Sequence, residues 1–192
     1  MRPKIILASN SPRRKELLRQ IGLSFTAAPA DVDERVLAEE TPEVYACRLA
    51  RQKAEAAGLR TEEGIIIAAD TIVVLEGSIL GKPDDAQDAK RMLSMLSGKM
   101  HRVITALAVL DKSAEEMAEA AAVTKVWFRE LAESEIASYV RTGEPLDKAG
   151  AYGIQERGAL LVDRIEGCYF NVVGLPLSLL AGLLRRFGIE LM

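Results

Sequence analysis

A single carboxylate, Asp70, interrupts an apolar run that is typical of a buried β-strand. Three isoleucines and two alanines precede it, and Thr71, Ile72 and two valines follow it. Burying a carboxylate is costly unless it is paired with a cation or bound to a metal. Ligand sites of α/β proteins form at the ends of strands, so Asp70 is a candidate site residue. The alternative is a carboxylate that faces solvent from an edge strand.

A compact acidic segment, Asp31-Val32-Asp33-Glu34, lies upstream. Hard divalent cations such as Mg²⁺ take several oxygen ligands and usually bridge to substrate phosphates. Taken alone, the segment is better explained as a solvated acidic loop. It becomes a candidate metal site, with Asp33 and Glu34 as ligands, if the fold brings it close to Asp70.

Two arginines, Arg13 and Arg14, stand at the predicted start of a helix. Ser11 is a good N-cap and Pro12 suits the first helical position, which places both arginines in the first turn. A cation there opposes the helix macrodipole and costs about 0.3–1 kcal/mol, whereas the free N–H groups attract anions. The motif, which begins at Ser9, therefore indicates a polyanion such as a nucleotide phosphate tail. Two solvated surface arginines are the alternative.

Two lysines could neutralise phosphate charge. Lys82 lies between Gly81, which permits close backbone approach, and Pro83, which stiffens the loop. Lys53 lies on a predicted helix among other charged residues. Taken singly, each lysine is better explained as an ordinary surface residue.

A glycine-rich segment follows Asp147 and ends at Gln155. Its glycines, Gly150 and Gly153, stand among small residues and suggest a loop whose backbone N–H groups approach a ligand. The Gln155 side chain offers both a donor and an acceptor, as reading a pyrimidine edge requires. A plain glycine turn is the alternative.

The composition limits the possible partners. The chain has 192 residues, 25 basic and 28 acidic, and a net charge of −3, which gives no global attraction to nucleic acid or anionic membranes. Two cysteines without a CxxC pair favour a reducing cytosol, and a single histidine, His101, argues against a common zinc site. No apolar run approaches the roughly 18 residues of a membrane span, and no secretory signal is recognised. We therefore expect a cytoplasmic protein.

Strand-like and helix-like segments alternate, which predicts an α/β protein with a mixed sheet flanked by helices. Strands are predicted at residues 4–8, 24–28, 65–75, 79–80, 103–110, 123–128 and 160–165. Helices are predicted at 12–21, 41–57, 85–97, 133–140 and 176–187. The alanine-rich segment 114–122 is ambiguous. We expect a single domain over residues 1–192, with two lobes around a central cleft.

Together, these residues resemble the Maf family of nucleoside triphosphate pyrophosphatases, and the resemblance covers essentially the whole chain. Its markers are Ser9-Asn10-Ser11-Pro12-Arg13-Arg14, Asp33-Glu34, Ala69-Asp70-Thr71, Gly81-Lys82-Pro83, Leu96-Ser97-Gly98, the segment from Asp147 to Gln155, and Val173-Gly174-Leu175-Pro176. Each marker is short, but their order and spacing are highly specific in combination.

The resemblance implies a fold related to inosine triphosphate pyrophosphatases, a cytoplasmic homodimer, and hydrolysis of nucleoside triphosphates to monophosphate and pyrophosphate. The subfamily that acts on dTTP and UTP has Arg, Thr and Gln at the positions of Arg13, Thr71 and Gln155, so the chain is similar to that subfamily. Two residues depart from the family pattern. Asp33 stands where Glu is frequent, and Glu156 stands where Gly commonly follows the glutamine.

The implied reaction is in-line attack of water on the α-phosphorus, which requires charge neutralisation, positioning and an activated water. We expect Asp70 to be the general base and, with Asp33 and Glu34, a ligand of Mg²⁺ or Mn²⁺. Lys53 and Lys82 would stabilise charge on the transferring and leaving groups. The residues expected to bind substrate are Ser9, Ser11, Arg13 and Arg14 at the phosphates, and Thr71 and Gln155 at the base, with Arg13 also a candidate for base selection.

Two other classes of protein remain open. The first is a non-enzymatic, nucleotide-binding regulator of septum formation, because the family name derives from that process. The second is a haloacid-dehalogenase-type phosphatase, since Asp31-Val32-Asp33 matches its nucleophile motif superficially. That motif needs a preceding buried strand, which Pro29 disfavours.

Overall fold

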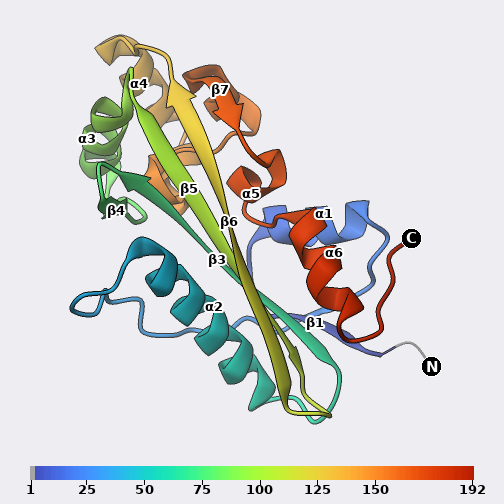
Figure 1. Cartoon of the computed structure of the whole chain (residues 1–192). Helices are drawn as coiled ribbons and strands as arrows, with labels where there is room; N and C mark the ends of the chain where they lie inside the picture. The colour runs from blue at the N-terminus through green and yellow to red at the C-terminus, as the bar shows by residue number, and fades with distance from the viewer. Residues whose placement is uncertain (1–2) are drawn as a thin grey trace. The chain divides into compact units, whose positions relative to one another are not determined.

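The computed structural model describes residues 3–192 and contains a mixed β-sheet with helices packed against it (Figure 1). Its strands are β1 (Ile5–Leu7), β2 (Thr26–Ala27), β3 (Ile65–Leu75), β4 (Ser78–Leu80), β5 (Met100–Asp111), β6 (Glu116–Phe128) and β7 (Val162–Glu166). Its helices are α1 (Pro12–Gln20), α2 (Pro42–Gly58), α3 (Ala86–Leu96), α4 (Glu133–Arg141), α5 (Tyr169–Val173) and α6 (Leu177–Arg185), with 3₁₀ turns η1 (Glu144–Asp147), η2 (Ala149–Ala151) and η3 (Glu156–Leu161).

The strand order over the described residues is β2-β1-β3-β5-β6-β7, with β4 paired to β3. Strand β1 pairs in parallel with β2 and β3, whereas the β3–β4 and β6–β7 pairs are antiparallel. The predicted α/β fold with a mixed sheet is therefore confirmed.

The chain divides into two compact units. Unit 1 comprises the described residues up to Asp70, together with Thr105–Ala122 and Gly174–Met192. Unit 2 comprises Thr71–Ile104 and Val123–Val173. Strands β3, β5 and β6 each contribute residues to both units.

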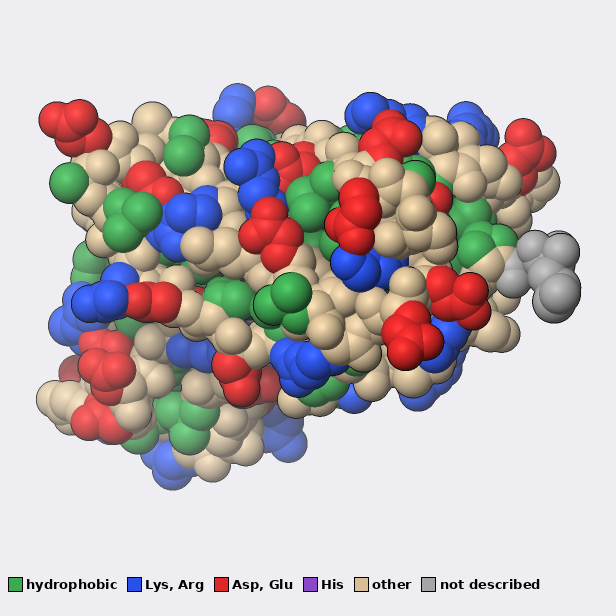
Figure 2. Space-filling view, turned by 90° about the horizontal axis from the view of Figure 1, so that it is seen from below, with side chains coloured by type: hydrophobic (Ala, Val, Ile, Leu, Met, Phe, Trp, Pro, Cys, Tyr) green, Lys and Arg blue, Asp and Glu red, His purple; other side chains and the backbone are tan. Residues whose placement is uncertain are grey.

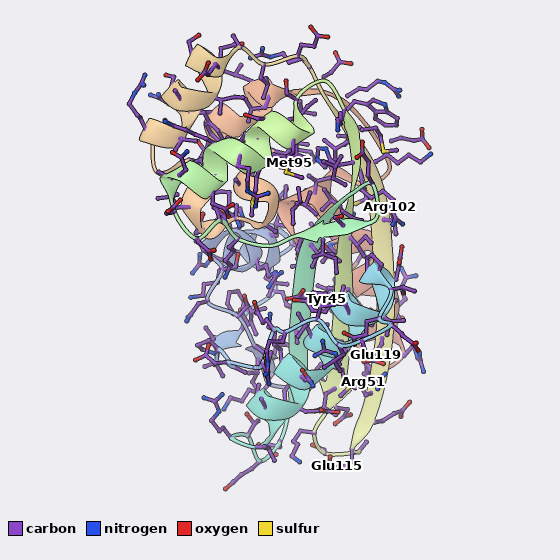
Figure 3. The ribbon with its side chains drawn as sticks, turned by 90° about the vertical axis from the view of Figure 1, so that its left-hand side faces the viewer. Tyr45, Arg51, Met95, Arg102, Glu115 and Glu119 are labelled. Carbon is purple, nitrogen blue, oxygen red and sulfur yellow. The ribbon has the colours of Figure 1, made fainter. Side chains whose placement is uncertain are left out.

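In unit 1, two crossover connections join the parallel strands. The chain passes from β1 to β2 and then returns past β1 to β3, so right-handed crossovers place α1 and α2 on opposite faces of the sheet. Figure 1 shows α2 on one face and α1 with α6 on the other. Ser11 caps α1 as predicted, because its Oγ accepts a hydrogen bond from the Arg14 N–H at 3.4 Å. On α2, Arg51 pairs with Glu119 of β6 at 2.6 Å (Figure 3).

In unit 2, a tight hairpin and a layer of helices contribute to one apolar core. Glu76 and Gly77 join β3 to β4 with φ values of +50° and +86°, the conformation favoured for two-residue hairpin loops. Helix α3 packs against α4 and the η1 and η2 turns. Buried residues of these elements, including Leu93 and Ile136, meet Phe128 of β6 in one apolar cluster.

Residues 116–122 of the ambiguous alanine-rich segment belong to strand β6, and residues 114–115 lie in the turn before it. Alanine favours helices, but Asp111 Oδ1 accepts hydrogen bonds from the N–H groups of Ser113 at 2.9 Å and Ala114 at 3.2 Å. This turn starts the chain back along β5, so sheet pairing overrides the local helical preference. Helix α5 and the three 3₁₀ turns were not predicted, and η3 delays the start of the strand predicted at 160–165 to Val162.

One face of the molecule mixes both signs of charge (Figure 2). On the face drawn in Figure 2, acidic and basic side chains are interspersed, in keeping with a net charge of −3. Within residues 3–192, every helix is too short or too polar to cross a membrane. Both Cys47 and Cys168 are free thiols.

Candidate active site

Asp70, the candidate site residue on β3, is buried and paired with a cation. Asp70 is 7% exposed, and its Oδ1 accepts a hydrogen bond from Lys53 Nζ of α2 at 2.6 Å. The ammonium group compensates the charge of the desolvated carboxylate, as burial of an ionised group demands. The structure therefore assigns Asp70 to the interior and brings it together with Lys53, which taken singly was better explained as a surface residue and which the family resemblance placed among the catalytic residues.

The acidic segment reaches the same lysine through Glu34. Lys53 Nζ donates a second hydrogen bond to Glu34 Oε1 at 2.8 Å, so one ammonium joins two carboxylates. The Tyr45 hydroxyl holds the segment in place by donating to the Glu34 carbonyl at 2.6 Å; Tyr45 is labelled on α2 in Figure 3. Burial raises the pKa of Tyr45, and the carboxylates of Asp70 and Glu34 raise it further, which keeps the hydroxyl a donor.

Asp33 faces a different partner. Its carboxylate accepts hydrogen bonds from Arg35 Nε at 2.9 Å and Nη2 at 2.5 Å, and from the Arg35 backbone N–H at 3.0 Å. These bonds lower the pKa of Asp33 to about 2. Of the two predicted metal ligands in this segment, the structure thus joins Glu34 to Asp70 through Lys53 and directs Asp33 to Arg35.

The start of α1, also in unit 1, carries a second group of predicted site residues. Arg14 Nε donates to the Gly174 carbonyl at 2.8 Å, and Nη1 donates to Ser9 Oγ at 3.3 Å. Ser9 Oγ also accepts from the Ser11 N–H at 3.1 Å. Arg13 follows in the same turn and is partly exposed. The two serines and Arg14 are therefore joined to Gly174, a residue that the sequence offered only as part of the Val-Gly-Leu-Pro marker.

The arginine and the carboxylates act on one another electrostatically. Burial lowers the pKa of the Arg14 guanidinium, and the negative charges of Asp70 and Glu34 oppose that shift. Unit 1 therefore gathers two cations, Arg14 and Lys53, and two carboxylates in one neighbourhood. Such a group can neutralise added negative charge and can also accept a proton.

The remaining predicted residues, Thr71, Lys82 and Gln155, belong to unit 2. Lys82 is exposed in the loop after β4, whereas Thr71 and Gln155 are partly exposed. The Gly150 N–H donates to the Gly81 carbonyl at 2.9 Å, which joins the loop carrying Lys82 to the loop that ends at Gln155.

The glycine at position 150 is required by its surroundings. It has a φ of +68°, and an added Cβ would lie 2.9 Å from Val73 Cβ. A side chain there would be strained and would also collide with β3. The glycine signal in the sequence therefore reflects packing within unit 2.

Comparison with known proteins identifies the family. A family model described as Maf-like protein matches residues 4–187. The chain belongs to the Maf family. Curated relatives named dTTP/UTP pyrophosphatase include one from Syntrophomonas wolfei, 50% identical over 97% of this chain and 98% of the relative. Another, from Anaeromyxobacter dehalogenans strain 2CP-1, is 52% identical over 100% of this chain and 97% of the relative.

A solved structure supports the fold of this Maf chain. A HAM1 protein from Coxiella burnetii superposes with a TM-score of 0.55 at 14% identity, over 96% of this chain and 99% of that chain. The predicted Maf/ITPase-like fold and the predicted family are both confirmed.

Proposed function

We propose that this Maf protein hydrolyses dTTP and UTP to the monophosphate and pyrophosphate. The observation that carries the proposal is the buried Asp70 carboxylate, held by Lys53 at 2.6 Å in the cluster that includes Arg14. Relatives that are 50% and 52% identical over nearly their full lengths are named for these two substrates. Chemistry and similarity thus support the same reaction class.

In this proposal, Asp70 accepts a proton from the water that attacks the α-phosphorus. A positioned general base of this kind contributes about 10²–10⁴-fold to a rate. Lys53 and Arg14 stabilise the charge that develops on phosphate oxygens, and Lys82 stabilises the pyrophosphate leaving group. Ser9, Ser11 and Arg13 contact the phosphates, with Arg13 also contributing to base selection, and Thr71 and Gln155 contact the base.

Glu34 and Asp70 fit a divalent cation, because both already bind one cation, the Lys53 ammonium. Mg²⁺ is usually held by one or two carboxylates together with substrate phosphates. Within residues 3–192, no three or more His, Cys, Asp or Glu side chains are grouped to hold a metal, so phosphate oxygens would complete the ligand set. Asp33 could join it after leaving Arg35. When bound, Mg²⁺ or Mn²⁺ supplies charge neutralisation and lowers the pKa of its water.

A panel of pyrimidine and purine triphosphates tests the function, with pyrophosphate and inorganic phosphate detected separately. We expect the highest kcat/KM for dTTP and UTP, with pyrophosphate released. Release of inorganic phosphate would support a haloacid-dehalogenase-type phosphatase instead. Tight nucleotide binding without turnover would support a non-enzymatic regulator. A preference for purines would overturn the roles of Arg13, Thr71 and Gln155.

We further propose that the protein is a cytoplasmic homodimer whose partners are nucleotides rather than nucleic acid or membranes. The free thiols of Cys47 and Cys168 support a reducing compartment, and the resemblance to the family supports the dimer. Light scattering of the purified chain tests the oligomeric state, with a monomeric mass as the contradicting result.

A further inference from the structure

A six-residue loop in unit 2 closes tightly on itself. It runs from Gly153 to Gly158 and carries Gln155 between its ends. A Cβ at Gly158 would lie 2.0 Å from the Gly153 carbonyl oxygen, a distance that no side chain can occupy. Only glycine at position 158 therefore lets the two ends approach so closely.

Two side chains hold the ends of this loop. The Tyr139 hydroxyl accepts a hydrogen bond from the Gly153 N–H at 3.2 Å and donates to Glu144 Oε1 at 2.9 Å. Glu144 Oε1 also accepts from the Gly158 N–H at 3.1 Å, and Oε2 accepts from the Arg157 N–H at 3.3 Å. The pair thus binds backbone donors at both ends of the loop.

The geometry of the pair fixes the direction of its hydrogen bonds. Every backbone group that it binds is a donor, so the carboxylate must act only as an acceptor. The Tyr139 side chain is buried, which makes its unmade hydrogen bonds costly. Lys148 adds a further contact by donating from Nζ to the Glu144 carbonyl at 2.5 Å.

The middle of the loop is held in a strained conformation. Glu156, directly after Gln155, has a φ of +53°, in the left-handed region that costs a non-glycine residue about 1–2 kcal/mol. Strain of this kind persists only where the surrounding structure fixes the backbone. The hydrogen bonds that Tyr139 and Glu144 accept from the loop backbone supply that restraint.

We propose that Tyr139 and Glu144 are positioning residues that fix the Gln155 loop and thereby sharpen discrimination between pyrimidine and purine triphosphates. This inference rests on the proposed function, because it takes Gln155 as a residue that contacts the base. Neither Tyr139 nor Glu144 is required to touch the nucleotide. They act through the backbone between Gly153 and Gly158.

Kinetics of Tyr139→Phe and Glu144→Gln test the selectivity. In Glu144→Gln, the new amide group faces a backbone donor. For both variants, we expect KM for dTTP to rise on the order of tenfold, as loss of a hydrogen bond to a charged group implies, with kcat nearly unchanged. The kcat/KM ratio of dTTP to dGTP should fall by a similar factor. Matched controls are Tyr169→Phe and Glu133→Gln, at exposed positions of the same unit.

A double variant tests whether the effect passes through Gln155. Once Gln155→Ala has removed the side chain, adding Glu144→Gln should lower the dTTP/dGTP ratio no further. A further fall of similar size in the double variant would overturn the proposed route. An unchanged ratio in both single variants, or an equal loss for every nucleotide, would also overturn it.

Hydrogen exchange without nucleotide separates this inference from the proposed function. The amides of Gly153, Arg157 and Gly158 should exchange on the order of tenfold faster in Tyr139→Phe and in Glu144→Gln. Unchanged exchange of these amides in both variants would show that Tyr139 and Glu144 do not fix the loop, even if dTTP is hydrolysed. If the wild-type chain releases no pyrophosphate, the proposed function fails, and so does the link to base discrimination. Faster exchange in the variants would still show that Tyr139 and Glu144 fix the loop. If Glu144→Gln does not fold, Tyr139→Phe, which removes one oxygen, decides the outcome.

Discussion

The two units hold their buried polar groups in opposite ways. In unit 1, charge is held by charge, since Lys53 joins Glu34 and Asp70 in a neighbourhood that includes Arg14. In unit 2, His101 is 1% exposed and burial lowers its pKa to about 4, so it is neutral at pH 7. Its Nε2 lies 2.7 Å from the Tyr152 hydroxyl.

The two units therefore differ in what their buried polar groups can do. The charged cluster of unit 1 can respond to an added anion or proton, because its members are ions whose pairing can be exchanged. The polar groups of unit 2 are committed to the core and to the backbone, as His101 and Glu144 illustrate. Loss of the Asp70 carboxylate in unit 1 should therefore change turnover, and loss of a buried polar group such as His101 in unit 2 should change stability.

The largest effect is expected for Asp70→Asn. The fold should be retained, and kcat for dTTP should fall by about 10²–10⁴-fold, because the amide cannot act as a general base. Pyrophosphate release measures the loss, and Asp163→Asn, at an exposed position of β7, is the matched control. Turnover near the wild-type rate would show that Asp70 is not the general base and would contradict the contrast between the two units.

Next in size is the effect of Lys53→Met on stability. Both Lys53 and Asp70 side chains are largely buried, at 13% and 10% exposed, so removing the cation leaves a buried carboxylate unpaired and should cost about 3–5 kcal/mol. Urea denaturation measures the change, and adding Asp70→Asn should recover part of it.

The control for this prediction is Lys125→Met. Its ion pair with Glu166 is exposed, at 46% and 61%, and exposed pairs contribute only about 0–1 kcal/mol. Equal losses in the two lysine variants would contradict a special role for the pairing in unit 1.

A smaller, pH-dependent effect is expected from His101. Its pKa is about 4 in the folded chain against the 6.5 usual for a histidine, so the unfolded chain binds more protons between these values. The free energy of unfolding should therefore fall as pH drops from about 6.5 to about 4, with His101 contributing about 2–3 kcal/mol of the loss.

His101→Phe isolates this contribution. The substitution removes the titrating group but leaves a ring that can pack against Phe128 and Tyr152, as the imidazole does. Urea denaturation at several pH values should show a shallower decline for the variant between pH 6.5 and 4. Parallel declines in the two proteins would show that the histidine is not buried neutral.

The smallest effect is expected for Glu156→Gly. Removing the side chain relieves the left-handed strain at a φ of +53°, but glycine also gains freedom in the unfolded chain. We expect a net stabilisation of about 0.5 kcal/mol by thermal denaturation. Glu133→Gly, at the start of α4, should instead destabilise by up to about 1 kcal/mol, and the same sign in both variants would contradict the strain.

Local signals in the sequence predicted much of the fold. Ser11 and Pro12 mark the start of α1, and Glu76-Gly77 marks the hairpin between β3 and β4. Such features depend on residues adjacent in the chain. The alanine-rich part of β6 could not be assigned, because its structure depends on pairing with β5 rather than on its own propensity.

The candidate site could be predicted only in part, because it is built by contacts between segments that are far apart in the sequence. The buried strand marked Asp70, but pairing with Lys53 and Glu34 depends on how α2 packs on the sheet. Asp33 and Glu34 are neighbours in sequence, yet they face different cations, which spacing cannot reveal. Tyr45 carried no signal, since its role is a bond to a backbone carbonyl.

The bond from Arg14 to the Gly174 carbonyl joins residues 160 positions apart. Synthesis of a protein begins at the N-terminus, so β1 and α1 emerge long before this acceptor exists. A chain interrupted before Gly174 lacks the contact, however well its first strands have formed. The surroundings of Arg14 are thus completed only after 160 further residues have been synthesised.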